Sequence, residues 1–136
     1  MRFYLDSNIL ITYIKSEFGG VTKAHSIRTK DFLVKTSVDK DVLILSDLTF
    51  EEIEKITYLT RKEIKELLNK FQIRHEETET TKETIEKSKQ VKKDCRIHFP
   101  DNIHVALAIQ SKADYMITWN QKDFNKTKKL IENKTP

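Results

Sequence analysis

The stretch Phe3-Tyr4-Leu5-Asp6-Ser7-Asn8 decides how this 136-residue chain folds. Residues 3–5 form a short apolar and aromatic run, which is typical of a buried strand. A second apolar run, residues 9–14, spans about two helical turns, and Ser7 or Asn8 suits the position of its cap. Asp6 is therefore predicted to lie at the carboxyl edge of a sheet, where open α/β proteins usually bind ligands. At this point Asp6 either caps the helix or binds a cation.

Two further apolar runs have the length of strands and lead into polar residues. Residues 42–45 are followed by Ser46 and Asp47, and residues 115–118 are followed by a polar loop that reaches residue 124. Continuous apolar strands of this kind predict a parallel sheet that helices cover on both faces. A weaker alternating pattern within residues 71–77 predicts a short edge strand.

Helical patterns separate these strands. They fall at residues 26–38, at a helix that begins near Thr49, and at residues 60–71, 80–95 and 103–109; the tail shows one weak helical turn near residues 130–131. The helix at 103–109 is apolar nearly all round and should be buried, and Pro100 suits its start. The order of elements predicts a single domain of residues 1–136. Its fold class is α/β, a small three-layer α/β/α sandwich around a central, mainly parallel sheet.

Composition excludes several classes of protein. The chain is 38% hydrophobic and 34% charged with a net charge of +4, which is typical of a soluble globular protein that tolerates polyanions. No apolar run approaches the ~20 residues of a membrane span, and no signal peptide is visible. The single cysteine, Cys95, excludes an internal disulfide, so we expect a cytoplasmic protein. The only two glycines, Gly19 and Gly20, predict a loop and leave none for a P-loop or a dinucleotide-binding motif.

Acidic residues are predicted to meet at one edge of the sheet. If the strands are parallel, Asp6, Glu52 and Asp101 can converge there with the loop that contains Asp123. Clustered carboxylates repel one another unless a cation compensates them, and oxygen ligands without Cys or His favour Mg²⁺ or Mn²⁺ over zinc.

Each of these residues also has a purely structural interpretation. Glu52 can close a capping box with Thr49, and Asp101 complements a helix dipole. Asp123 suits a solvated loop. The four histidines lack the spacing of metal ligands and are expected at the surface or in packing: His25, His75, His98 and His104.

Taken together, four stretches resemble the PIN-domain nucleases. They are YLDSNIL at residues 4–10, SDLTFEEI at 46–53, PDNIHVALAI at 100–109 and ADYMITWNQKDF at 113–124. The resemblance spans nearly the whole chain, and its size is similar to that of the VapC-type toxin ribonucleases. It implies a small parallel-sheet α/β sandwich that binds Mg²⁺ or Mn²⁺ through clustered acids and cleaves RNA.

The resemblance also implies a role for individual residues. Asp6, Glu52 and Asp101 match three acids of the family, which makes them expected catalytic residues and metal ligands, and Asn8 matches a residue that orients the acids by hydrogen bonds. The fourth motif departs from the family's T-x-D, because Asn120 stands where an acid is usual. Asn120 can coordinate a cation through its carbonyl oxygen but adds no charge. Asp123 is the remaining candidate for the fourth acid.

The resemblance implies a metal-dependent endoribonuclease that hydrolyses single-stranded RNA. It also implies two protein partners, an antitoxin protein and a second copy of the chain in a homodimer. Three alternatives stay open at this point. One is a housekeeping RNA-processing nuclease of the same family. Another is a degenerate PIN-like module that binds RNA or protein without catalysis, which Asn120 favours. The third is a different Mg²⁺ enzyme, such as a phosphatase or a receiver domain phosphorylated on Asp6.

Overall fold

The computed structural model describes residues 1–17 and 23–136. The loop predicted around Gly19 and Gly20 lies outside the described residues. The described chain contains five strands in one sheet, all of them parallel, in the order β3-β2-β1-β4-β5. The strands are β1 (Arg2–Leu5), β2 (Val42–Ser46), β3 (Arg74–Thr78), β4 (Tyr115–Ile117) and β5 (Glu132–Lys134).

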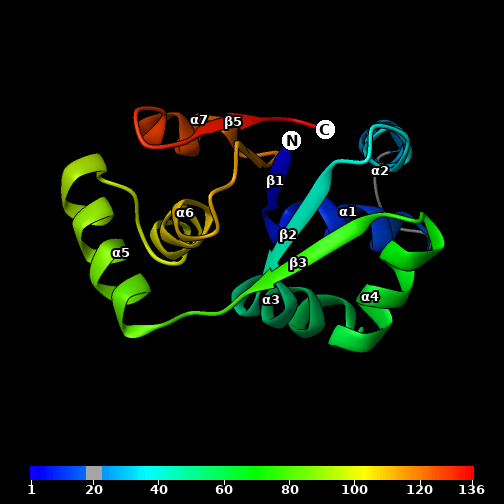
Figure 1. Ribbon diagram of the computed structural model, residues 1–136, viewed down its shortest axis with the longest axis horizontal. Coiled ribbons are helices and arrows are strands. Elements are labelled where there is room, and N and C mark those ends of the chain that lie inside the picture. The colour runs from blue at the N-terminus through cyan, green and yellow to red at the C-terminus, as the bar shows by residue number, and fades with distance from the viewer. Residues whose placement is uncertain (18–22) are drawn as a thin grey trace.

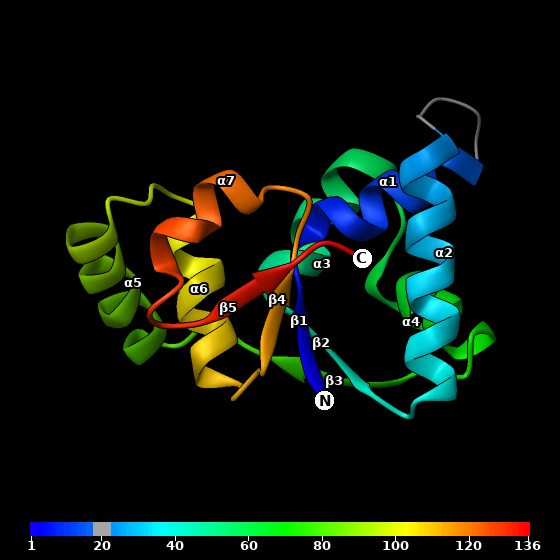
Figure 2. The same ribbon diagram turned by 90° about the horizontal axis from the view of Figure 1, so that it is seen from above.

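Helices cover both faces of this sheet, as Figures 1 and 2 show. One face packs against α1 (Ser7–Glu17), α2 (Lys23–Val38), α3 (Asp47–Thr57) and α4 (Arg61–Lys70). The other packs against α5 (Lys82–Cys95), α6 (Asp101–Gln110) and the short α7 (Gln121–Phe124), which continues into the 3₁₀ turn η1 (Asn125–Thr127). The predicted three-layer α/β/α sandwich is confirmed.

The sheet has one hydrophobic core on each face. Successive side chains along a strand point to opposite faces and so contribute to the two cores in turn. On β1, Phe3 and Leu5 point into the core beneath α1–α4, whereas Tyr4 points to the face of α5–α7. On β2, Leu43 and Ile44 divide between the two faces in the same way. Because both faces of the inner strands are buried, their sequences read as unbroken apolar runs.

The strand order places a topological switch point beside Asp6. From β1 the chain moves outward to β2 and β3 on one side, and it later returns to add β4 and β5 on the other. The carboxyl ends of β1 and β4 therefore diverge into connections on opposite sides of the sheet. Open α/β sheets usually bind ligands in the crevice at such a point.

Three local features differ from the prediction. Helix α3 begins at Asp47 rather than at Thr49, because Ser46 caps it: the Ser46 hydroxyl oxygen accepts a hydrogen bond from the Thr49 backbone N–H. The tail keeps a turn near residues 130–131, where the Ile131 backbone N–H donates to the Thr127 carbonyl oxygen over 3.0 Å, but it then forms the edge strand β5, which was not predicted. The polar stretch after β4 was expected as a loop and contains the single turn of α7.

None of the described helices combines the length and the apolar character that a membrane span requires.

Candidate metal centre

Asp6 lies directly after β1, and its side chain is only 7% exposed. The Thr118 hydroxyl, at the end of the neighbouring β4, donates to Asp6 Oδ2 over 2.7 Å. Burial raises the pKa of Asp6, and the hydrogen bonds from Thr118 and from the Asn8 backbone N–H only partly offset this. Asp6 thus occupies the capping position before α1 and also faces the switch point, so the two roles weighed from the sequence are compatible.

Glu52 lies on the second turn of α3 and is half-buried. The capping box predicted between Thr49 and Glu52 is absent, because Ser46 rather than Thr49 is the N-cap. Glu52 Oε1 instead lies 2.6 Å from His104 Nε2. Burial alone would raise the pKa of Glu52, but the hydrogen bonds from His104 and Ser7 together with the charge of His104 lower it. Glu52 is therefore an ionised carboxylate that points into the site.

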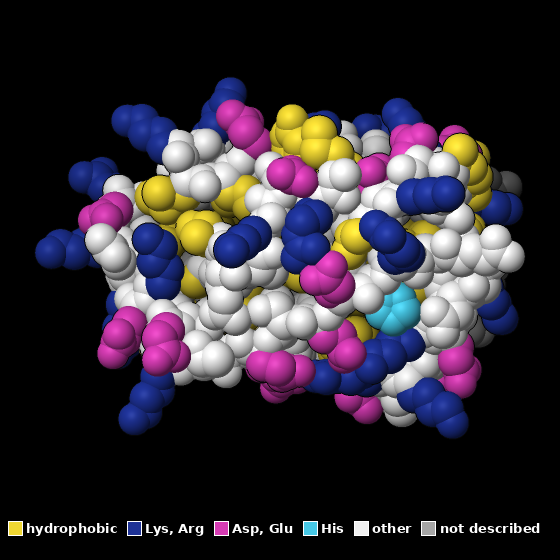
Figure 3. Space-filling view, in the orientation of Figure 1, with side chains coloured by type: hydrophobic (Ala, Val, Ile, Leu, Met, Phe, Trp, Pro, Cys, Tyr) yellow, Lys and Arg dark blue, Asp and Glu magenta, His cyan; other side chains and the backbone are white. Residues whose placement is uncertain are grey.

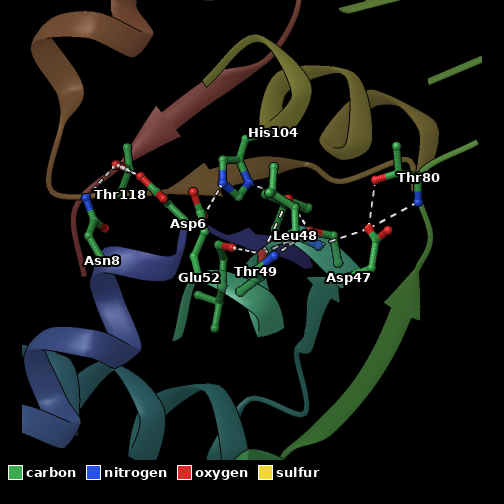
Figure 4. A network of polar contacts seen from close by, with 12 residues as sticks. Asp6, Asn8, Asp47, Leu48, Thr49, Glu52, Thr80, His104 and Thr118 are labelled. Atoms are coloured by element: carbon green, nitrogen blue, oxygen red, sulfur yellow. Dashed lines mark hydrogen bonds and ion pairs between the residues drawn. The ribbon is translucent and has the colours of Figure 1, made fainter. Parts of the chain in front are cut away.

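Asp6, Glu52 and His104 form one cluster, shown in Figure 4. One potential ligand atom from each of the three residues lies within 4.8 Å of the other two. The three side chains come from β1, α3 and α6, elements that are far apart in the sequence. The parallel sheet brings them together at its carboxyl edge, as the sequence predicted for the two acids.

Asp101, the first residue of α6, is coupled electrostatically to the same acids but is not part of the Asp6–Glu52–His104 cluster. Burial raises the pKa of Asp101 to about 6, and the negative charges of Asp6, Asp123 and Glu52 add to this rise. A carboxyl that keeps its proton because three neighbouring carboxylates are negatively charged marks a strongly negative site. Asp101 is thus electrostatically coupled to every other acid predicted for the site.

The fourth motif is held to the site by a chain of hydrogen bonds. The Asn120 backbone N–H donates to Thr118 Oγ1 over 2.9 Å, and the Asn120 side-chain amide donates to Asp123 Oδ2 over 2.9 Å. Asn120 thus directs Asp123, on α7, and its own carbonyl oxygen remains as a potential ligand. Asn8 takes part less directly, because its side chain contacts Thr118 Oγ1 and the Trp119 backbone N–H, each over 3.4 Å, rather than an acid.

His104 is the site residue that the sequence interpretation missed. It was expected at the surface or in packing, yet it is 1% exposed and contacts Glu52. The available signal was its place three residues after Asp101 within the most apolar helix, since residues at i and i+3 share one helix face. The other histidines do not belong to the acid cluster of the described residues.

These donors fit a hard divalent cation. Burial, and after it the negative charges of Asp6, Asp123 and Glu52, raise the pKa of Asp101, and a bound cation would oppose this rise. Oxygen donors of this kind suit Mg²⁺ and Mn²⁺. Asp6, Glu52 and Asp101 are the residues that would hold the ion, with Asp123 and Asn120 available on the remaining side.

Comparison with known proteins identifies a family and a shared fold. The sequence model of the PIN domain matches residues 3–130. A search of curated protein sequences found no match.

Solved structures of toxin–antitoxin complexes share the fold. A chain of VapBC2 from Rickettsia felis, bound to a DNA fragment from its promoter, superposes with a TM-score of 0.69 at 16% identity and covers 99% of this chain and 98% of its own. A chain of VapBC-1 from nontypeable Haemophilus influenzae gives 0.62 at 18% identity with the same coverage. A toxin–antitoxin complex from Klebsiella pneumoniae gives 0.60 at 22% identity, covering 89% of this chain and 88% of its own.

Proposed function

Because the chain belongs to the PIN domain family, we propose that it is a Mg²⁺- or Mn²⁺-dependent endoribonuclease that hydrolyses single-stranded RNA. The observation that carries the proposal is that Asp6 and Glu52 converge at the topological switch point of the sheet, with Asp101 electrostatically coupled to both. The fold-level likeness to toxin–antitoxin complexes favours the toxin of such a pair over a housekeeping RNA-processing enzyme.

The chemistry of the reaction sets what the side chains must do. A bound divalent cation supplies positive charge for the phosphate and lowers the pKa of a water. Asp6, held in place by Thr118 and by the start of α1, keeps one carboxylate at the deepest point of the site. Glu52 and Asp101, on α3 and α6, would hold the cation together with Asp6.

Asp101 and Asp123 lie nearer to solvent than Asp6. A carboxyl with a pKa of about 6 in the cation-free site can exchange a proton close to neutral pH. Binding of a cation would therefore release this proton, because the positive charge favours the ionised carboxylate of Asp101. Asp123, directed by Asn120, supplies the fourth negative charge that the family motif usually obtains from an acid at the Asn120 position.

Contacts with the RNA backbone require free cations near this edge. Arg61 and Lys65 of α4 are already paired with acids of the 77–79 region, since Arg61 contacts Glu77 and Glu79, and Lys65 contacts Glu77. Three lysines that follow α7 are exposed and form none of the ion pairs found among the described residues: Lys126, Lys128 and Lys129. These lysines lie between α7 and β5, and because none of these ion pairs involves them they are the stronger candidates for phosphate contacts.

Two protein partners belong to the proposal. An antitoxin that covers the acidic edge would block access of RNA to Asp6 and Asp101. A second copy of the chain would form the homodimer that the family resemblance implies. A location in the cytoplasm follows from the same proposal, since RNA is the substrate.

Cleavage of RNA tests the proposal. Purified protein should cut a single-stranded RNA in Mg²⁺ or Mn²⁺, stop cutting in EDTA, and leave 5′-phosphate and 3′-hydroxyl ends. A folded Asp101→Asn variant should lose at least about a hundredfold in rate, because the substitution removes a charge but keeps the shape. Full activity in that variant, or equal activity in EDTA, would contradict the proposal.

The absence of an acid at Asn120 favours a second candidate, a PIN-like module that binds RNA or protein without cleaving it. Binding of a cation separates the two. A catalytic site should raise the melting temperature in Mn²⁺, since a ligand at 100 times its Kd stabilises by roughly 2.7 kcal/mol. A melting temperature that stays constant in Mn²⁺, together with RNA binding, would favour the module.

A further inference from the structure

His104 joins the candidate metal centre to a chain of buried hydroxyl groups. One side of its ring faces the site, where Nε2 lies 2.6 Å from Glu52 Oε1. On the other side Nδ1 lies 2.7 Å from Tyr4 Oη, which in turn lies 2.8 Å from Ser46 Oγ. We infer that His104 is a positioning residue that holds the Glu52 carboxylate toward Asp6 without binding the cation itself. This inference rests on the proposed function, because it gives His104 a role within that metal centre.

The hydrogen bonds of His104 leave no lone pair for a metal ion. Glu52 is ionised and can only accept, so the proton of the short contact belongs to Nε2. Nδ1 is engaged by the Tyr4 hydroxyl, and the ring is 1% exposed. A ring whose two nitrogens are both used and which is closed off from solvent acts as a donor to Glu52. This distinguishes the cluster from a zinc site, in which the histidine nitrogen would face the metal.

At the end away from His104, the series of hydroxyl groups is hydrogen-bonded to the backbone. Ser46 Oγ accepts from the Thr49 backbone N–H over 3.0 Å, and Thr49 Oγ1 donates to the Leu5 carbonyl oxygen over 3.2 Å. Leu5 immediately precedes Asp6. The network therefore connects β1, the start of α3 and α6, the elements at which Asp6, Glu52 and Asp101 lie.

The arrangement explains why Glu52 keeps its direction. Its neighbour Glu51 is exposed and has no such constraint, whereas Glu52 is held between the His104 imidazole and the Ser7 hydroxyl. Groups that orient a metal ligand from behind commonly change metal affinity by about 10–100-fold when they are removed. A merely structural histidine would instead affect folding stability and leave the affinity for the cation unchanged.

Two substitutions of His104 separate these roles. In His104→Gln the side-chain amide nitrogen reaches the ε position, which faces Glu52. In His104→Asn the amide nitrogen stops at the δ position, which faces Tyr4. Both variants are smaller and both lose one half of the network, so they form a matched pair for stability. His75→Gln, on the edge strand β3, is the control for an unrelated histidine.

Affinity for Mn²⁺, measured by calorimetric titration of the full chain, is the readout. We expect His104→Gln to bind Mn²⁺ within about threefold of the unsubstituted chain and His104→Asn to bind about tenfold or more weakly. Both variants should melt at a lower temperature without metal, and His75→Gln should change neither quantity. Tyr4→Phe, which removes only the hydroxyl that orients the ring, should weaken Mn²⁺ binding by a smaller factor, about threefold.

The outcomes separate this inference from the proposed function. Equal affinities in His104→Gln and His104→Asn, whether retained or lost, would overturn the positioning role. If His104→Asn does not fold, unchanged Mn²⁺ affinity in Tyr4→Phe would overturn it. A difference between the two His104 variants in a protein that cleaves no RNA would support the positioning role and contradict the ribonuclease. An unsubstituted chain that binds no Mn²⁺ would overturn both.

Discussion

At the scale of single residues, the acids of the site differ in what holds them. Asp6 accepts a hydrogen bond from Thr118, and Glu52 accepts one from His104. The ionisation of Asp101 is set mainly by its burial and by the neighbouring negative charges. The raised pKa of Asp101 means that the cation-free site is destabilised when this group ionises. Function and stability are therefore opposed at this position.

Asp101→Asn should stabilise the cation-free protein near neutral pH. The raised pKa of Asp101, about 6 against an ordinary 3.8, favours folding below pH 3.8 and loses this contribution as the pH rises through 6. The neutral amide does not suffer this loss, so the variant should exceed the unsubstituted chain by about 1 kcal/mol near pH 7.5, a value reduced for solvent screening. Thermal melts in EDTA at about pH 4 and pH 7.5 check this. A variant that is less stable at the higher pH would contradict it.

Thr118→Val should weaken cation binding without unfolding the protein. Valine has the shape of threonine but cannot donate to Asp6 Oδ2, so the pKa of Asp6 should rise further and its carboxylate should lose its orientation. We expect Mn²⁺ affinity to fall about tenfold. Thr118→Ser keeps the hydroxyl and serves as the control. The same Mn²⁺ affinity in the Val and Ser variants would exclude this role for Thr118.

Asp6 follows an apolar run and Asp101 precedes one, whereas Glu52 was predicted from its place in the stretch SDLTFEEI, and the resemblance to the PIN-domain nucleases joined the three acids into a group. His104 could not be predicted, because a single histidine on a buried helix is more often a packing residue, and its partner Glu52 is 52 positions away in sequence. The hydroxyls of Tyr4 and Ser46 were unpredictable for the same reason. Pairings between distant residues depend on the sheet order, which no local pattern contains.

At the scale of elements, most helix ends follow their sequence signals. Thr60 and Thr81 cap α4 and α5 with complete capping boxes. At α3 two candidate caps compete, and Ser46 prevails over Thr49 because the strand β2 ends there. Because the N-cap lies three residues before Thr49, Glu52 does not take part in capping and its side chain is available to the site. The polar strand β5, Glu132–Lys134, was missed because it lacks the apolar pattern that identified the inner strands.

The C-terminal end of α3 allows a test of how a residue at a helix end affects stability. Tyr58 adopts a left-handed conformation with φ of 65°, and its side chain is 85% exposed. Glycine enters this conformation without the clash of a Cβ, so Tyr58→Gly should stabilise the protein by about 0.5–1 kcal/mol. Urea unfolding measures the change. The same substitution at Lys55, exposed inside the last turns of α3, should instead destabilise by about 1 kcal/mol. A destabilised Tyr58→Gly would contradict this. It would show that contacts of the tyrosine side chain stabilise the fold by more than the left-handed backbone conformation costs.

At the scale of the whole molecule, the fold collects acids at one edge and distributes cations over the surface. Figure 3 shows Lys and Arg side chains interspersed with Asp and Glu on the face in view, rather than gathered in one patch. The net charge of +4 is therefore a poor guide to where RNA binds. Pairing decides which cations remain available, and this could not be predicted from counts of lysine along the chain. That residues 1–136 form a single domain stays a prediction.

Free and paired lysines should behave differently toward RNA. Replacing Lys126, Lys128 and Lys129 by Gln should weaken binding of a single-stranded RNA and reduce the slope of log affinity against log salt by roughly 2, at about 0.7 per phosphate contact. Replacing Arg61 and Lys65 by Gln should change that slope little, because these cations already contact Glu77. Titrations by fluorescence anisotropy in Ca²⁺, over a range of salt, measure both. Equal slopes in the two variants would contradict this assignment of the RNA surface.

We propose that Asp6, Glu52 and Asp101 share a divalent cation at the switch point of the sheet. Diffraction from crystals soaked in Mn²⁺, collected near the manganese absorption edge, locates such an ion directly. We expect an anomalous peak about 2.0–2.3 Å from carboxylate oxygens of Asp6, Glu52 and Asp101, with His104 Nε2 still bonded to Glu52. A peak elsewhere, or a peak coordinated by His104, would contradict this proposal.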